Sequence, residues 1–159
     1  MNGKSNIVII GGGVIGLSLA YHLSKKGAKD ILLLERNQLT SGTTWHAAGI
    51  VGPLRPSLNF TQLASKALET CPELERDTGL ATGYQQTTGY WIARCPERMD
   101  ELKRIHAVAE FSGMTPEMVS GDEVAARVPR ISAQGIHGAL TIKEDGQVNP
   151  VALSMAYVK

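Results

Sequence analysis

Three glycines near the start of the chain have the spacing that a phosphate-binding turn requires. Gly11, Gly13 and Gly16 form the pattern G-x-G-x-x-G. Gly11 permits a tight turn between a strand and a helix, Gly13 leaves room for a pyrophosphate beside the backbone, and Gly16 lets the helix pack closely on the strand. Backbone N–H groups at the start of that helix, including those of Val14 and Ile15, would face the phosphates, whose negative charge the helix dipole favours. The spacing therefore predicts a dinucleotide-binding turn.

An acidic residue farther along the chain supports the same chemistry. Glu35 follows Gly16 by 19 residues, the usual distance for a carboxylate that accepts hydrogen bonds from ribose hydroxyls. A carboxylate at this place would repel a 2′-phosphate. A glycine-rich turn in another kind of α/β protein is the alternative, but it does not account for Glu35. These residues alone do not distinguish NAD from FAD.

The apolar pattern predicts the elements that position these residues. Residues 7–10 and 31–34 are consecutive apolar runs, which are typical of fully buried strands in a parallel sheet. Between them, residues 14–26 carry apolar side chains at helical spacing, and Gly27 follows where a left-handed C-terminal cap is expected. The sequence therefore predicts a β-α-β unit with the glycines in its first turn.

Residues 39–49, with the sequence LTSGTTWHAAG, make the prediction more specific. With this run the chain resembles the sarcosine and dimethylglycine dehydrogenases, which are FAD-dependent oxidoreductases of the D-amino-acid oxidase superfamily. The resemblance covers nearly the whole chain, although only residues 35–50 are highly specific. It continues through Leu54-Arg55-Pro56 and, more loosely, through Glu75, Gly79, Gly83-Tyr84, Gln86, Gly89, Ala93, Asp145-Gly146 and Pro150.

The resemblance implies a cofactor site. His46 would carry FAD covalently through the 8α-methyl group of the flavin; the alternatives are a non-covalent contact with the flavin and a purely structural histidine. Glu35 and Arg36 would meet the adenosine end, and residues 42–50 would run along the pyrophosphate and the flavin ring. The candidate cofactor-binding residues are Gly11, Gly13, Val14, Ile15, Gly16, Glu35, Arg36, Gly42, Thr43, Thr44, Trp45, His46, Ala47, Ala48, Gly49 and Ile50.

The resemblance also implies a reaction. A longer parent protein would oxidatively demethylate a small N-methylated glycine, sarcosine or dimethylglycine, by hydride transfer to FAD. The electrons would pass to an acceptor such as an electron-transfer flavoprotein, and tetrahydrofolate would bind in a C-terminal region outside this chain. Two alternatives stay open. One is an FAD-dependent oxidase of another amino acid or secondary amine, and the other is a non-catalytic nucleotide-binding subunit completed by a partner chain.

No residue of this chain is assigned a catalytic role with assurance. Arg55 is a candidate contact for a substrate carboxylate, because a guanidinium group pairs well with a carboxylate. A solvated loop arginine or a salt bridge is the alternative. Tyr90 and Trp91 either line a pocket or belong to the core, which is the more usual place for an aromatic residue on a strand.

The predicted fold class is α/β: a Rossmann-like FAD-binding unit (β-α-β with G-x-G-x-x-G) and the beginning of an α+β substrate domain. Residues 1–83 and 149–159 are assigned to the FAD-binding domain, and residues 84–148 to the first part of the substrate domain. An FAD domain of this type needs further parallel strands, so the chain is expected to be truncated and inactive alone. Its exposed strand edge and apolar surface are expected to promote self-association.

The pattern after residue 50 predicts further elements. A helix over residues 60–74 is expected to kink or break at Pro72. Residues 84–93 are expected to be extended, with Gly89 as a bulge. Further helices are predicted over residues 96–111, after a capping box formed by Ser120 and Glu123, and after Pro150, and another strand is predicted over residues 136–142.

Composition limits the kinds of partner. The chain has 159 residues, 43% of them hydrophobic and 19% charged, with a formal net charge of +1. This composition is typical of a globular domain and gives no electrostatic reason to expect nucleic acid or a membrane as partner. The four histidines and two cysteines show no metal-ligand spacing and no disulfide framework, so no metal site is predicted. The first strand begins too close to Met1 for a presequence, which favours the bacterial cytoplasm or, for a mature eukaryotic form, the mitochondrial matrix.

Overall fold

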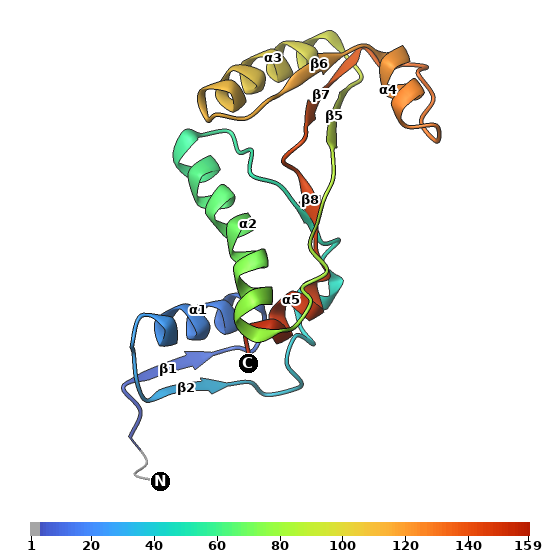
Figure 1. Cartoon of the computed structure of the whole chain (residues 1–159). Coiled ribbons are helices and arrows are strands. Elements are labelled where there is room, and N and C mark those ends of the chain that lie inside the picture. The colour runs from blue at the N-terminus through green and yellow to red at the C-terminus, as the bar shows by residue number, and fades with distance from the viewer. Residues whose placement is uncertain (1–3) are drawn as a thin grey trace. The chain divides into compact units, whose positions relative to one another are not determined.

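The chain forms two units, shown in Figure 1 in a computed structural model that describes residues 4–159. Unit 1 comprises the described residues up to Ile50 together with Thr70–Tyr84 and Val148–Lys159. Unit 2 comprises Val51–Glu69 and Gln85–Gln147. Residues 51–69 therefore belong to unit 2, whereas the sequence-based division placed them in the first region. The physical reason is that Leu54 is completely buried in the core of unit 2.

Unit 1 contains the predicted β-α-β element. Strands β1 (Ile7–Ile10) and β2 (Ile31–Leu34) pair in parallel, and helix α1 (Val14–Lys25) connects them. Gly27 has φ = +87° just after the helix, as expected of a left-handed C-terminal residue. The type and the bounds of these three elements agree with the prediction to within one residue.

One face of the strand pair is open to solvent. Val8 is 52% exposed and Ile10 is 87% exposed, and their register partners Leu32 and Leu34 are also exposed. The prediction of fully buried strands is therefore wrong for this chain. The helix α1 covers the opposite face, where Ile9 is buried, and no described residue covers the face of Val8 and Ile10.

The chain leaves the strand pair through a short helical turn and a long helix. The turn η1 (Thr43–His46) is followed by β3 (Ile50–Val51) and by α2 (Leu58–Thr78). Helix α2 continues through Pro72, so the predicted break does not occur. Proline removes one backbone donor, but the neighbouring Cys71 and Leu74 are buried, and their packing keeps the segment helical.

Unit 2 is organised around a three-stranded antiparallel sheet with the order β5-β7-β6, built from β5 (Gly89–Ala93), β7 (Gly138–Ile142) and β6 (Glu117–Val119). Every residue of the central strand β7 is buried, because both of its faces carry a hydrophobic cluster. Trp91 packs on one cluster and Tyr90 on the other. Both aromatic residues therefore belong to the core, as is usual for strands.

Helix α3 (Pro96–Phe111) has the predicted bounds, and its Leu102 and Ala109 lie in one of the two clusters. A second sheet has three strands in the order β3-β8-β4, in which β8 (Gly146–Gln147) pairs with β4 (Gln85–Gln86). Helix α5 (Pro150–Ala156) follows β8 in the sequence and belongs to unit 1. Gly89 begins β5 within a regular ladder, so it is not the predicted bulge.

None of the described helices is long and apolar enough to cross a membrane, and the described residues include no cluster of three potential metal ligands.

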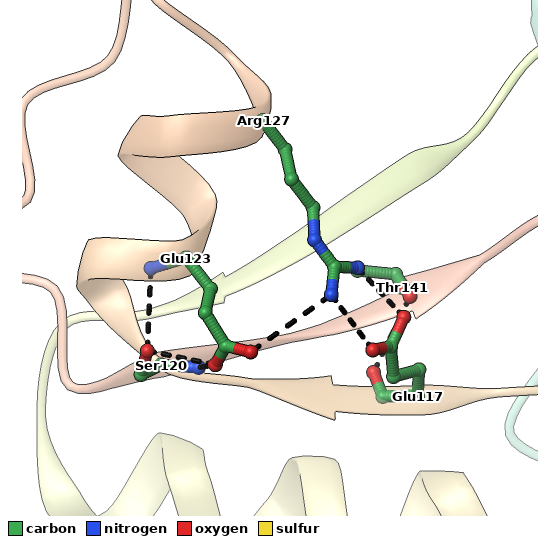
Figure 2. Close-up of polar contacts among 5 residues, drawn as sticks. All are labelled: Glu117, Ser120, Glu123, Arg127 and Thr141. Carbon is green, nitrogen blue, oxygen red and sulfur yellow. Dashed lines mark hydrogen bonds and ion pairs between the residues drawn. The ribbon is translucent and has the colours of Figure 1, made fainter.

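Helix α4 (Gly121–Arg127) begins with the predicted capping box, shown in Figure 2. The Ser120 hydroxyl accepts a hydrogen bond from the Glu123 N–H at 3.2 Å, and the Glu123 carboxylate accepts one from the Ser120 N–H at 2.7 Å. At the other end of the helix, the Arg127 guanidinium forms a bidentate ion pair with the carboxylate of Glu117 in β6. These bonds to the ionised forms lower the pKa of both Glu117 and Glu123. The capping box stabilises the start of α4, and the ion pair joins its last turn to β6.

Candidate cofactor groove

The glycine turn of unit 1 has the geometry that the sequence predicts. Gly11 has φ = +113°, a conformation that glycine adopts without strain, and its N–H donates to the Leu34 carbonyl at 2.8 Å. A methyl group on Gly16 would overlap the carbonyl oxygen of Gly11, so this glycine allows α1 to lie against the turn. A methyl group on Gly13 would contact the hydroxyl of Thr44. Close contacts at Gly13 and Gly16 thus leave no room for a side chain at either position.

Gly12 is a further requirement of the turn that sequence reasoning missed. A side chain at Gly12 would overlap Leu39 and crowd Glu35, both of which lie directly over it. Its carbonyl also accepts a hydrogen bond from the N–H of Thr40, which has φ = +67°. The signal in the sequence was the run of three consecutive glycines at 11–13, which is longer than the motif needs.

The carboxylate of Glu35 is held by the backbone of this turn. It accepts hydrogen bonds from the N–H groups of Gly12 at 2.7 Å and Asn37 at 2.9 Å. The bond from Gly12, followed by the one from Asn37, lowers the pKa of Glu35 below its ordinary value, so the group is ionised at neutral pH. Each oxygen retains a lone pair, which leaves the carboxylate able to accept a further hydrogen bond from a hydroxyl.

The N-terminus of α1 is only partly capped. Its N-cap residue is Gly13, which has no side chain to accept a hydrogen bond. The Thr44 hydroxyl accepts from the Val14 N–H at 3.0 Å, so this donor, which the sequence analysis assigned to the phosphates, has a partner within the protein. The N–H groups of Ile15 and Gly16 also lie in the first turn, where helix geometry gives them no acceptor within the helix. They remain suited to an anionic oxygen.

A groove with a volume of about 860 Å³ runs along these groups within unit 1. The predicted residues that line it are Gly11, Gly13, Val14, Ile15, Gly16, Glu35, Arg36, Gly42, Thr43, Thr44 and Ala47. Trp45, His46, Ala48, Gly49 and Ile50 do not line it. The groove thus joins the glycine turn, the acidic residue and the first part of the Trp-His loop, although these lie up to 36 positions apart in the sequence.

The Trp45-His46 pair projects from the end of η1. The Trp45 indole donates to the Ser41 carbonyl at 3.1 Å, and the rings of Trp45 and His46 meet edge to face with centroids 4.0 Å apart. The His46 side chain is exposed, as are Ala47 and Ile50. Exposed imidazole and apolar groups of this kind can contact an aromatic ring system, and an accessible imidazole nitrogen can act as a nucleophile.

The end of this loop is fastened to a distant part of unit 1. Gly49, at φ = +75°, accepts a hydrogen bond from the Val148 N–H at 2.8 Å, and a side chain on Gly49 would overlap the Val148 carbonyl. Val148 leads into α5, whose N-terminus is capped by the Asn149 side chain. The position of the loop therefore depends on residues about 100 places later in the chain.

Arg55, the candidate contact for a substrate carboxylate, belongs to unit 2. Its Nη1 donates to the carbonyls of Gly52 at 2.9 Å and Leu54 at 2.7 Å. Within the described part of the chain, Nε and Nη2 make no hydrogen bond, so one edge of the exposed guanidinium is available to a ligand. Arg55 forms no salt bridge with the described acidic residues, which removes one of the two alternatives for its role.

The groups along the groove fit a dinucleotide. The glycine turn has no side chains, two N–H groups of the first helical turn have no acceptor within the helix, and the ionised Glu35 carboxylate can accept a hydrogen bond from a hydroxyl. The arrangement matches a pyrophosphate flanked by a ribose, with exposed apolar residues farther along for a ring.

Comparison with known proteins agrees with this geometry. The model of the family described as "FAD dependent oxidoreductase" (DAO) matches residues 6–159. Among curated proteins, the chain is 40% identical over 152 residues to 4-methylaminobutanoate oxidase (formaldehyde-forming) of Paenarthrobacter nicotinovorans, covering 96% of this chain and 18% of that protein. It is 40% identical over 147 residues to the mitochondrial sarcosine dehydrogenase of Homo sapiens, covering 92% of this chain and 16% of that protein.

A third relative is named as a regulatory subunit, whereas the first two are named as an oxidase and a dehydrogenase. The chain is 35% identical over 153 residues to the mitochondrial pyruvate dehydrogenase phosphatase regulatory subunit of Mus musculus, covering 96% of this chain and 17% of that protein. The chain thus spans less than a fifth of the length of each of these three relatives.

Solved structures share the fold. L-proline dehydrogenase from P. horikoshii superposes with a TM-score of 0.87 at 21% identity, over 97% of this chain and 40% of that one. Glycine oxidase from Bacillus cereus superposes with a TM-score of 0.81 at 29% identity, over 97% of this chain and 42% of that one. The mixed α/β fold predicted from the sequence is therefore confirmed.

Proposed function

The chain belongs to the family of FAD-dependent oxidoreductases, and from that premise we propose that it is the FAD-binding portion of an amine dehydrogenase acting on sarcosine or dimethylglycine. The observation that carries the proposal is the groove of unit 1, which the glycine turn, Glu35 and residues 42–44 and 47 line together. The 40% identity to a sarcosine dehydrogenase over 92% of this chain supports the same substrate class.

The residues of the groove have separate tasks in this proposal. The N–H groups of Ile15 and Gly16 bind the pyrophosphate, and the Glu35 carboxylate accepts hydrogen bonds from the ribose. Arg36 lies beside the adenosine end, and residues 42–50 follow the pyrophosphate toward the flavin ring. FAD, when bound, supplies the oxidation of the carbon next to the amine nitrogen.

The covalent bond to FAD belongs to this proposal as well. His46 is exposed at the end of η1, and its ring is oriented by the edge-to-face contact with Trp45. The tether between Gly49 and Val148 limits how far the loop can move. An imidazole that is both accessible and held in place would be suited to replace one hydrogen of the flavin 8α-methyl group, with the two electrons of the broken C–H bond taken up by the flavin itself.

Unit 2 supplies the beginning of the substrate domain in this proposal. The free edge of the Arg55 guanidinium would pair with the carboxylate of a small N-methylated amino acid. The electrons would leave through an acceptor such as an electron-transfer flavoprotein, and tetrahydrofolate would bind elsewhere in the longer protein. The proposed location is the bacterial cytoplasm or the mitochondrial matrix.

Intact mass under denaturing conditions tests the proposal. The full-length gene product is expressed with excess riboflavin, and we expect the mass of one FAD to remain attached to the peptide that contains His46. A His46→Ala variant should lose the adduct, whereas His137→Ala, which changes an exposed histidine of unit 2, should keep it. Flavin that dissociates completely on denaturation would rule out the covalent bond, and a folded protein without flavin would rule out the whole proposal.

A non-catalytic nucleotide-binding subunit is the second candidate, and the 35% identity to a phosphatase regulatory subunit favours it specifically. Turnover separates the two. A purified full-length protein that binds flavin and oxidises sarcosine or dimethylglycine with an artificial electron acceptor would exclude the regulatory candidate. Flavin binding without turnover of any amine in a substrate panel, together with a partner that co-purifies, would support it.

An FAD-dependent oxidase of another amino acid or secondary amine is the third candidate. The identity to 4-methylaminobutanoate oxidase favours it as strongly as the sarcosine dehydrogenase match favours the first. The same substrate panel, run with oxygen and with an artificial acceptor, distinguishes an oxidase from a dehydrogenase.

A further inference from the structure

Unit 2 contains a buried carboxyl group to which neither the cofactor groove nor the proposed reaction gives a role. Asp145 lies in the turn between β7 and β8 and is 8% exposed. Its backbone carbonyl accepts a hydrogen bond from the Thr87 N–H at 2.7 Å, which fixes the turn beside the approach to β5. An acidic side chain at such a depth needs specific partners.

Two glycines make the space for this carboxyl group. A methyl group on Gly52 would overlap Oδ1 of Asp145, and a methyl group on Gly89 would overlap Oδ2. The two oxygens therefore lie against two different backbone segments, the loop after β3 and the start of β5. No other residue type at either glycine would leave the carboxyl group where it is.

The carboxyl group lies among few charges. Burial raises the pKa of Asp145, while a hydrogen bond from Trp91 and the charge of Arg55 act in the opposite direction. Glu144, the adjacent carboxylate, adds to the increase. Among the described residues, the charges that act on Asp145 are those of the cation Arg55 and the anion Glu144.

The segment that Asp145 contacts is also the support of Arg55. The Arg55 guanidinium donates to the carbonyl of Gly52, the residue whose Cα lies against Oδ1 of Asp145. The Arg55 backbone is fixed as well, because its N–H donates to the Thr61 hydroxyl at 3.0 Å and the same hydroxyl donates to its carbonyl at 3.1 Å. A displacement of Gly52 would therefore move the guanidinium, while the Thr61 contact holds the backbone behind it.

We propose that Asp145 is a positioning residue for Arg55, acting through its contact with Gly52, and that it sets the direction in which Arg55 presents its free edge to a substrate carboxylate. This inference rests on the proposed function in one respect, namely that Arg55 binds the carboxylate. Asp145 itself does not touch the substrate. Its removal should weaken recognition of the carboxylate without slowing the chemistry at the N-methyl carbon.

Two measurements on the FAD-loaded full-length protein test the proposal. Crystal structures report the contact between Arg55 Nη1 and the Gly52 carbonyl, which are 2.9 Å apart here, and steady-state kinetics report recognition of the substrate. The substrates are the N-methylated amino acid that is turned over and its primary amide, which keeps the methylamine but lacks the carboxylate. Asp145→Ala removes both oxygens that lie against Gly52 and Gly89. In this variant we expect the contact between Arg55 Nη1 and the Gly52 carbonyl to lengthen beyond about 3.5 Å. We expect KM for the acid to rise about tenfold, as for the loss of one charge-assisted hydrogen bond. We expect kcat, and KM for the amide, to stay within about twofold, because neither depends on the carboxylate contact.

Control variants separate the possible outcomes. Asp122→Ala, the same change at an exposed position of α4, should alter neither measurement. If Asp145→Ala does not fold, Gly52→Ala takes its place, since its methyl group pushes on the same oxygen, and the same KM split is expected. An unchanged contact between Arg55 Nη1 and the Gly52 carbonyl, or an equal loss of kcat for the acid and the amide, would overturn the positioning role. An Arg55→Lys variant with unchanged KM would instead remove the carboxylate role of Arg55, whatever the crystal structures show.

Discussion

Helices α1 and α4 begin in different ways, although a glutamate carboxylate near each N-terminus accepts a hydrogen bond from a backbone N–H group. At α4 the Ser120 hydroxyl and the Glu123 carboxylate satisfy each other's backbone donors, and Figure 2 shows the closed ring of bonds that results. At α1 the N-cap is a glycine without a side chain, and Glu35 binds Gly12 in the turn before the helix. The first turn of α1 carries no acidic side chain, whereas the first turn of α4 carries Asp122 and Glu123.

The difference shows what turns a helix N-terminus into a binding site. Both ends have the same partial positive charge from the helix dipole. At α4 the acidic side chains of the first turn neutralise this charge, which stabilises the fold and leaves little positive charge to attract an anionic ligand. At α1 the only side-chain cap is Thr44, which lies 30 residues away and reaches Val14 alone. The absence of a local cap at Gly13 is therefore as informative as the presence of the glycines.

The substitution expected to have the largest effect on stability and flavin binding is at Gly16, in the first turn of α1. In Gly16→Ala the new methyl group overlaps the Gly11 carbonyl, so α1 must move away from the turn. We expect the free energy of unfolding to fall by about 3 kcal/mol, the upper range for overpacking a close contact, and bound flavin to be lost. Thermal unfolding and the flavin-to-protein absorbance ratio measure the two effects.

Ser24→Ala is the control, because it changes an exposed side chain near the other end of the same helix. A Gly16→Ala variant that is as stable and as yellow as Ser24→Ala would show that the close approach of α1 to the turn is not needed.

A smaller effect is expected from exchanging the carboxylates for amides. Glu35→Gln weakens the bonds to Gly12 and Asn37 and the acceptor for the ribose, so we expect the Kd for FAD to rise about tenfold, as for the loss of one charge-assisted hydrogen bond. Glu123→Gln makes the same exchange in the capping box of α4 and should leave the Kd unchanged. Flavin fluorescence titration of the apoprotein measures both values.

Acid pH provides a second way to compare Glu35 at the start of α1 with Glu123 at the start of α4. The pKa of each glutamate is lowered in the folded protein, so the stabilisation is present above the ordinary pKa of 4.5 and is lost as the pH falls through the lower folded value. Flavin release on acidification should therefore lose part of its pH dependence in Glu35→Gln but not in Glu123→Gln. Equal behaviour of the two variants would contradict separate roles for the two helix starts.

The smallest effect is expected at the closed helix start. Ser120→Ala removes the N-cap acceptor of α4, which should lower the free energy of unfolding by about 1 kcal/mol and leave flavin binding intact. Chemical denaturation followed by circular dichroism measures this change, and Ser120→Thr, which keeps the hydroxyl, serves as control. A loss of flavin in Ser120→Ala would mean that the capping box affects the groove as well as its own helix.

Much of unit 1 was predictable because its determinants are local. The apolar runs at 7–10 and 31–34, the glycine spacing and Gly27 each specify backbone geometry within a few residues, and the three elements fall where the sequence places them. The capping box of α4 and the bounds of α3 were predictable for the same reason. Roles in binding FAD stay predictions for all of the candidate residues.

The errors arose where distant residues decide the structure. Burial on both sides of Pro72 keeps α2 continuous, against the local effect of proline. The three residues of β6 are too few to show a pattern and are ordered by pairing with β7. Gly89 looked like a bulge, yet its lack of a side chain serves the carboxyl group of Asp145, 56 positions later. No periodicity in the sequence contains such information.

The tether between Gly49 and Val148 has a consequence for the order of events during biosynthesis. A ribosome adds roughly 5–20 residues per second, so the partner that fastens the loop is made about 5–20 s after the loop itself. During that interval the nascent chain already contains His46 and the complete glycine turn, but the loop has no anchor. Flavin captured so early would meet an imidazole that is free to turn away. If FAD attaches to His46 as proposed, holding the loop with a late residue would delay that attachment until Val148 has been translated.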